Sequence, residues 1–156
     1  MSDLFSLLES LQSPVIKTRR NAVIDLGKSK NPDAVLPLIA ALSDKNPVIR
    51  REVTVALGRL DDERSVPSLI AVLTDTDPDV RAGAVSALGK LKDRRAVLPL
   101  TQCLRDDNDR IRAGAAEILG KLNDPRAVDS LKNASNDPFE HVRDSVNLAL
   151  NRLLGK

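Results

Sequence analysis

A motif that returns every 31 residues constrains this chain more than any other feature. The stretch from Asp75 to Leu91, with the sequence DTDPDVRAGAVSALGKL, has counterparts along the whole chain in which an arginine and a leucine keep their spacing. The recurring arginines are Arg19, Arg50, Arg81, Arg112 and Arg143. A fixed period of this length is typical of stacked repeats that bury their apolar faces against their neighbours. We therefore predict one domain of five repeats, at about residues 1–30, 31–61, 62–92, 93–123 and 124–156.

Each repeat is expected to form two helices, called helix A and helix B below. In the third repeat the pattern predicts helix A from about Glu63 to Thr74 and helix B from Pro78 to Leu91. An Asn or Asp before each helix can cap its free N–H groups, and a proline often follows at the first helical position. One stripe of helix B is apolar, as in a helix that buries one face: Val80, Ala84, Ala87, Leu88 and Leu91. The predicted fold class is all-α, an α-solenoid of five helical hairpins.

Prolines near the fifth or sixth residue of helix A suggest a second local feature. Pro37, Pro67 and Pro99 recur there, and a proline inside a helix removes one backbone hydrogen bond and bends the helix. We therefore expect helix A to be a bent outer helix.

Composition limits the environment and the partners. Aromatic residues make up only 1% of the chain, so Leu, Val, Ile and Ala must fill the interior, and the net charge of +2 favours neither nucleic acid nor membrane. Cys103 is the single cysteine and occupies a small core position, which indicates a reducing environment. Residues Met1 to Leu11 do not resemble a signal peptide, and no apolar run could span a bilayer. We expect a soluble, cytoplasmic protein.

Three segments resemble the HEAT-like repeat first associated with phycobilisome lyases: Asp75-Thr-Asp-Pro-Asp-Val-Arg81, Ala87-Leu-Gly-Lys-Leu91 and Asp93-Arg-Arg-Ala-Val-Leu-Pro-Leu100. The resemblance covers essentially the whole chain. It implies an armadillo-like helical solenoid with helix A on the convex side and helix B lining a concave groove. Most proteins of this kind hold other proteins. Some cyanobacterial members attach or detach bilins or assist phycobilisome assembly, and a distant branch holds iron for hydroxylation.

Two rows of charge recur with the repeat. The arginine row runs beside Asp44, Asp75, Asp106 and Asp137, and we interpret each arginine as bridging to an aspartate of its own or the adjacent turn, which fixes the stacking of repeats. A second row contains Lys28, Arg59, Lys90, Lys121 and Arg152. Its cations suit the C-terminal ends of helices, or they form a positive edge for an acidic partner or a phosphate backbone.

Positions that vary on the exposed side of helix B are the better guide to a binding site. The first two repeats present cations beside apolar residues, and the next two present a trough of small residues in which Gly83 and Gly114 allow either a partner or an adjacent helix to approach. The predicted partner-binding residues are Arg20, Ile24, Lys28, Arg51, Val55, Arg59, Ala82, Gly83, Ser86, Lys90, Ala113, Gly114, Glu117 and Lys121.

Catalytic chemistry finds little support in the sequence. His141 is the only histidine and Cys103 the only cysteine, so a zinc site lacks ligands, and the His-Glu pairs of the iron-binding branch are absent. We expect no catalytic residue, no metal and no cofactor.

The favoured hypothesis is a non-enzymatic scaffold that binds a protein partner in the groove lined by helix B. One alternative is a bilin lyase subunit or a phycobilisome assembly or degradation factor, and it depends on the resemblance alone. Another is binding of nucleic acid or phosphate along the basic edge, which lacks Tyr and Trp for stacking. Leu148, Leu150, Leu153 and Leu154 crowd the last helix, so a weak homodimer through the C-terminal helix is a further expectation.

Overall fold

The computed structural model describes residues 3–155, which form ten α-helices and five short 3₁₀ turns with no β-strand. The predicted all-α fold class is confirmed. These residues group into two compact units, one up to Leu91 and the other from Lys92 onward, and the prediction of a single domain stays a prediction. Within residues 3–155, no helix has the length and apolar character that crossing a membrane requires.

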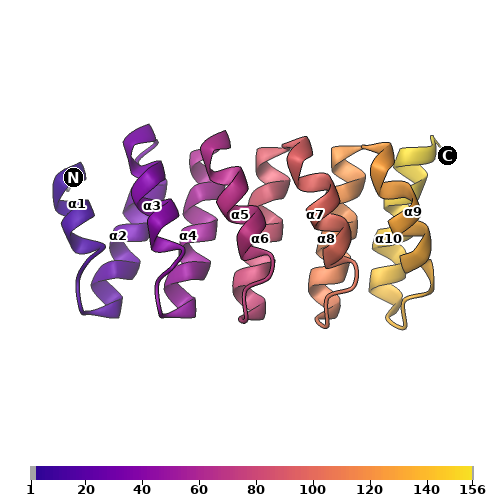
Figure 1. Ribbon diagram of the computed structural model, residues 1–156, viewed down its shortest axis with the longest axis horizontal. Helices are drawn as coiled ribbons and strands as arrows, with labels where there is room; N and C mark the ends of the chain where they lie inside the picture. Colours follow the sequence, from indigo (N-terminus) through magenta and orange to yellow (C-terminus); the bar gives the residue numbers. More distant parts are fainter. Residues whose placement is uncertain (1–2, 156) are drawn as a thin grey trace. The chain divides into compact units, whose positions relative to one another are not determined.

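The first unit contains three helical hairpins (Figure 1). Its A helices are α1 (Leu4–Ser10), α3 (Val35–Ala41) and α5 (Val66–Val72). Its B helices are α2 (Ile16–Lys28), α4 (Pro47–Leu60) and α6 (Pro78–Leu91). Helix α4 packs against both α2 and α6, so the B helices form one layer, and each A helix packs on the B helix that follows it.

The second unit contains two hairpins of the same design (Figure 1). They are built from α7 (Val97–Cys103), α8 (Asp109–Leu122), α9 (Val128–Asn133) and α10 (Glu140–Leu154). The 3₁₀ turns lie at Pro32–Ala34, Glu63–Ser65, Arg94–Ala96, Pro125–Ala127 and Ala134–Asn136.

The predicted caps explain where the helices begin. The side chain of Asn46 accepts a hydrogen bond from the N–H of Val48 at the start of α4, and Asn108 does the same for Arg110 at the start of α8. An aspartate or asparagine also caps each of the first four 3₁₀ turns. Each such bond satisfies a backbone N–H that has no acceptor inside its own helix.

The three A-helix prolines lie elsewhere in their helices than predicted. Each predicted A helix is divided into a 3₁₀ turn and an α-helix, so Pro67 is the second residue of α5, and Pro37 and Pro99 are the third residues of α3 and α7. N–H groups in the first turn of an α-helix have no intrahelical acceptor. The prediction that these prolines remove a bond from inside a helix was therefore wrong.

Glycines near the ends of the B helices are buried rather than exposed. A Cβ atom on Gly27 would lie 2.8 Å from the Cα of Ala56, and one on Gly120 would lie 2.8 Å from the Cα of Ala149. Glycine is needed here because the next B helix approaches the backbone directly. Gly27, Gly58 and Gly120 are all buried, and Gly89 of the third repeat is partly buried.

The arginine row joins consecutive hairpins, as predicted. Arg50 donates from Nε and Nη2 to the carboxylate of Asp75 at 2.8 Å each, and from Nη1 to the carbonyl of Asp44 in its own turn at 2.9 Å. Arg19 binds Asp44 and Arg112 binds Asp137 in the same two-pronged way. The Arg50 guanidinium lowers the pKa of Asp75 below its usual value. Each arginine thus holds its own turn and the following turn together.

Substituting Arg50 by alanine should reduce the free energy of unfolding by roughly 2 to 4 kcal/mol, because the Asp75 carboxylate would lose its counter-charge while largely shielded from water. Chemical denaturation followed by circular dichroism measures the loss. Arg59→Ala is the matched control, because Arg59 lies on the same helix, is exposed and has no ion pair among residues 3–155. Equal denaturation midpoints for the two variants would contradict the stacking role.

Candidate functional site

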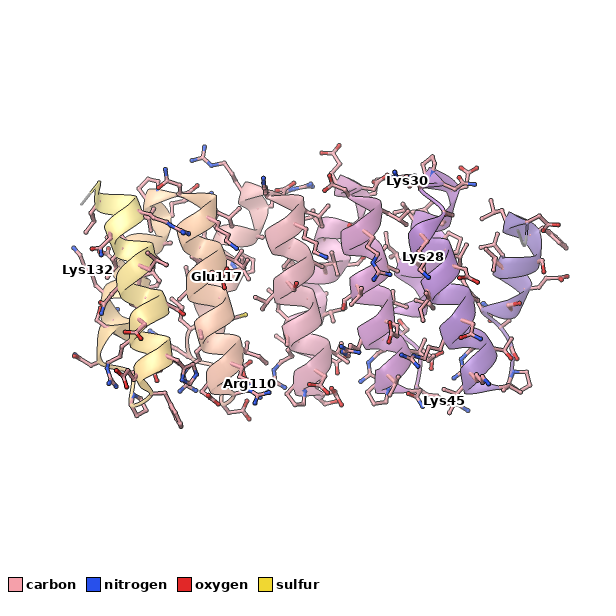
Figure 2. All side chains as sticks on the ribbon, turned by 180° about the vertical axis from the view of Figure 1, so that it is seen from behind. Lys28, Lys30, Lys45, Arg110, Glu117 and Lys132 are labelled. Carbon is pink, nitrogen blue, oxygen red and sulfur yellow. The ribbon has the colours of Figure 1, made fainter. Side chains whose placement is uncertain are left out.

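The B helices of the two units carry every residue predicted to bind a partner, and none of these residues is buried. Figure 2 shows the side opposite to that of Figure 1, where the B helices face the viewer, and labels Lys28 on α2 and Glu117 on α8. Nine of the predicted residues are exposed: Arg20, Lys28, Arg51, Arg59, Ala82, Ser86, Lys90, Glu117 and Lys121. The other five are partly buried: Ile24, Val55, Gly83, Ala113 and Gly114.

In the first unit, two arginines converge on one carboxylate. Arg20 of α2 donates from Nη2 to Oε1 of Glu52 at 3.0 Å, and Nη1 of Arg51 lies 3.6 Å from the same oxygen. The side chain of Glu52 is only 12% exposed, whereas those of Arg20 and Arg51 are about half exposed. One negative charge thus anchors two cations on neighbouring helices, and the cluster keeps a net positive charge.

Apolar and basic side chains surround this cluster. Ile24 and Val55, each one turn further along its helix, are partly buried and leave some apolar surface open. Lys28, Arg59 and Lys90 lie near the C-terminal ends of α2, α4 and α6, and none of them forms an ion pair within residues 3–155. We call the exposed surface formed by Arg20, Ile24, Lys28, Arg51, Val55, Arg59 and Lys90 the basic face.

Gly83 was predicted to allow the close approach of either a partner or an adjacent helix, and the structure shows contact with the adjacent helix. A Cβ atom on Gly83 would collide with Oγ1 of Thr54, a buried side chain on α4 that donates a 2.7 Å hydrogen bond to the carbonyl of Arg51. The contact between α4 and α6 therefore accounts for this glycine. Beside it, Ala82 and Ser86 remain exposed.

The B layer of the second unit differs in charge. Nζ of Lys121 lies 2.6 Å from Oε1 of Glu117 one turn earlier on α8, so the two charges are paired. Ala113 and Gly114 are partly buried on the same helix. Lys121 is thus compensated within its own helix, whereas its counterparts Lys28, Arg59 and Lys90 in the first unit are not.

The single histidine pairs with an aspartate of the neighbouring helix. Nε2 of His141 lies 2.9 Å from Oδ2 of Asp109 on α8. Among residues 3–155, no three His, Cys, Asp or Glu side chains are grouped so that they could hold a metal ion. Cys103 is buried, as predicted for a core position.

The predicted self-association surface lies on α10. Leu148 and Leu154 are exposed, and Leu150 and Leu153 are partly buried. The exposed side chains of Asn147 and Asn151 on the same helix make this surface partly polar. Self-association stays a prediction.

Glu52 is the residue of this site that the sequence interpretation missed. It occupies the helix position taken by Gly83 and Gly114 in the next two repeats, so the carboxylate does not recur with the repeat. A signal existed, because an acidic residue directly after Arg51 is the obvious partner for a neighbouring cation.

The fold and this surface define a protein of stacked helical hairpins with a charged, partly apolar B layer. Residues 4–76 and 66–151 match the model of HEAT repeats, so the chain belongs to the HEAT-repeat family. This confirms the resemblance seen in the sequence. No curated protein sequence matches the chain.

Several solved structures share the fold. The complex of CpcE and CpcF of phycocyanin lyase from Nostoc sp. PCC7120 aligns with a TM-score of 0.85 and 26% sequence identity. The alignment covers 100% of this chain and 66% of the lyase chain, so this chain spans slightly less than two thirds of the length of the lyase chain. A designed armadillo repeat protein in complex with the peptide (KR)4 aligns with a TM-score of 0.72 and 19% identity over 96% of this chain and 81% of that chain. An engineered protein aligns with a TM-score of 0.70 and 20% identity over 98% and 80% of the two chains.

Replacing Gly83 by alanine should destabilise the chain by about 1 to 2 kcal/mol, because the new methyl group collides with Thr54. In a Thr54→Ala background the same change should cost much less, since the hydroxyl is gone and alanine favours a helix over glycine by about 1 kcal/mol. The coupling energy from the four unfolding curves measures the contact. Additive effects would mean that Gly83 is needed for another reason.

Proposed function

We propose that this HEAT-repeat protein is a non-enzymatic scaffold whose basic face binds a segment of a partner protein. The observation that carries the proposal is the pair Arg20 and Arg51, both held on Glu52 and both still half exposed beside Ile24 and Val55. Arginines fixed in this way lose less conformational freedom on binding than free side chains do. The site therefore combines oriented charge with apolar contact.

The charge of the basic face indicates the partner. Arg20, Arg51, Lys28, Arg59 and Lys90 outnumber the acidic Glu52 among them. A partner segment with apolar side chains flanked by carboxylates complements this surface, and such complementarity raises the association rate and the specificity. The armadillo-like neighbour holds a peptide of the opposite, basic kind, (KR)4. The shared architecture supports peptide binding, and the charge here favours an acidic ligand.

The double substitution Arg20→Glu/Arg51→Glu should abolish binding of the partner, because it replaces two oriented cations by like charges next to Glu52. Affinity capture from the native host, followed by titration of the captured partner, should show at least about a hundredfold loss of affinity for the variant, since truncating one member of a close charge pair already costs about 2 kcal/mol or more.

The matched control is Lys132→Glu, which alters an exposed cation on α9 in the other layer of the fold. It should capture the same partner with unchanged affinity. A partner list that is identical for the wild type and the double variant would overturn the assignment of the basic face.

A second candidate function is a role in bilin handling. The specific observation in its favour is the likeness to the complex of CpcE and CpcF of phycocyanin lyase over the whole of this chain. In that case the partner would be a second HEAT-repeat chain or a bilin-carrying protein.

Absorption spectroscopy tests this candidate directly. The chain has no Trp and no Tyr and absorbs little at 280 nm, so a bound bilin would dominate its spectrum. If the chain handles bilins, gel filtration after incubation with a free bilin should give a visible band that elutes with the protein. A protein peak without visible absorption, with all pigment in the small-molecule fraction, would contradict it.

A further inference from the structure

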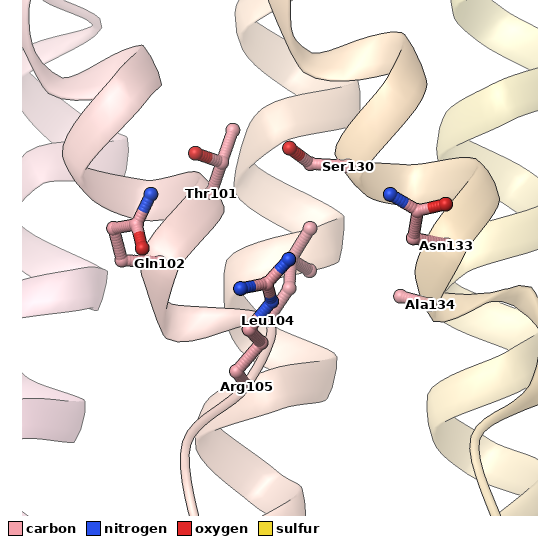
Figure 3. A pocket seen from close by; sticks show the side chains of 7 residues that line it. All are labelled: Thr101, Gln102, Leu104, Arg105, Ser130, Asn133 and Ala134. Atoms are coloured by element: carbon pink, nitrogen blue, oxygen red, sulfur yellow. The ribbon is translucent and has the colours of Figure 1, made fainter.

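The A-helix layer of the second unit contains a hollow lined mainly by polar side chains. It has a volume of about 90 Å³ and lies between α7 and α9 (Figure 3). The side chains around it include Gln102 and Arg105 from the α7 hairpin and Ser130 and Asn133 from α9. This is room for a few water molecules or one small polar group.

The same place in the first unit is a natural comparison. A hollow between α3 and α5 uses positions related by two repeats to those of the second unit. There Ser43 stands in place of Arg105 and Ala71 in place of Asn133. The first unit also contributes an acidic residue, Asp75, whereas none of the residues around the second hollow is acidic.

Two further positions also carry a more polar residue in the second unit than in the first. Thr101 stands where the first unit has Ile39, and Gln102 stands where it has Ala40. Stacking of repeats does not explain Gln102, Arg105 and Asn133, because the first unit packs with the smaller residues Ala40, Ser43 and Ala71 at these positions. The second hollow has therefore gained a cation and two amides.

The side chains of the second hollow are available to a ligand. Within residues 3–155, the side chains of Arg105, Gln102, Ser130 and Asn133 form no hydrogen bond or ion pair with the protein. The guanidinium of Arg105 points into the space between the two helices, and the hydroxyl of Ser130 also faces that space (Figure 3). The hydroxyl of Thr101 is not free to donate to a ligand, because it donates to the carbonyl of Leu98 at 2.6 Å.

These donors favour a singly charged oxyanion. A guanidinium offers two parallel N–H groups that match the two oxygens of a carboxylate, and amide and hydroxyl donors can complete the shell. One cation with neutral donors matches the charge of a carboxylate better than that of a dianionic phosphate. We infer that the hollow between α7 and α9 is a carboxylate-binding site, filled by an acidic side chain of a protein partner or by a free small carboxylate.

Nuclear magnetic resonance titration of the full chain tests this site, with the side-chain amides of Gln102 and Asn133 and the Nε–H of Arg105 as probes. The ligands are acetate, the blocked peptide acetyl-Gly-Glu-Gly-amide and the same peptide with Gln in place of Glu. Acetate and the Glu peptide should shift the three probes in a saturable way, and the Gln peptide should not. Tighter binding of the Glu peptide assigns the site to a protein partner, and equal binding assigns it to a free carboxylate.

Substitutions test whether the chemical-shift changes come from binding in the hollow. Arg105→Gln should weaken binding at least about tenfold, because a charge-assisted hydrogen bond is lost, and Arg105→Lys should be intermediate, because lysine keeps the charge without the paired geometry. Arg110→Gln is the matched control, since Arg110 is an exposed arginine of α8 without an ion pair in the part of the chain that the structure describes.

Three results would overturn the site: unchanged binding in Arg105→Gln, equal loss in Arg110→Gln, or preferential binding of inorganic phosphate over both carboxylates. Circular dichroism of each variant checks that the fold is intact, which is expected because Arg105 is exposed and its side chain forms no hydrogen bond or ion pair within residues 3–155. Absence of saturable shifts in the wild type would refute the inference outright.

Discussion

The hydrogen-bonded ion pair between an arginine near the start of one B helix and the aspartate of the next turn is the constraint on which each unit depends. The pairs Arg19 with Asp44, Arg50 with Asp75, and Arg112 with Asp137 have the same separation in sequence and the same atoms in contact. The aspartate is held in place by its own turn as well, since Oδ1, the oxygen that accepts from the arginine Nη2, also accepts the backbone N–H two residues later. Apolar packing alone would let two helices slide, whereas this two-pronged contact has one register.

Much of this architecture could be predicted because it is local or repeated. Asn46 and Asn108 announce helix starts through bonds to nearby N–H groups, so their effect can be deduced from neighbouring residues alone. The arginine and aspartate rows recur in step, so their pairing can be predicted from the sequence. The bounds predicted for the third B helix, Pro78 to Leu91, agree with α6.

The features that the sequence did not predict have a different cause, because they depend on contacts between residues of different hairpins. The packing of Gly27 on Ala56 and of Gly83 on Thr54 depends on how closely two B helices approach, and helical periodicity carries no such distance. The convergence of Arg20 and Arg51 on Glu52 is likewise a property of neighbouring helices. The position of Pro67 was misjudged for a subtler reason, because a 3₁₀ turn and an α-helix have similar apolar spacing over a few residues.

The two layers of the fold have unequal freedom to change. In the B layer, Gly27 and Gly120 admit backbone contact, so a larger side chain there would displace a whole helix. In the A layer, neighbouring helices leave hollows, and residues around them differ widely between the two units. Mutations at the exposed positions around these hollows can therefore accumulate at little structural cost, whereas the buried A-helix residues remain part of the core. A repeat protein built this way can acquire new recognition surfaces on one side while its stacking is inherited unchanged on the other.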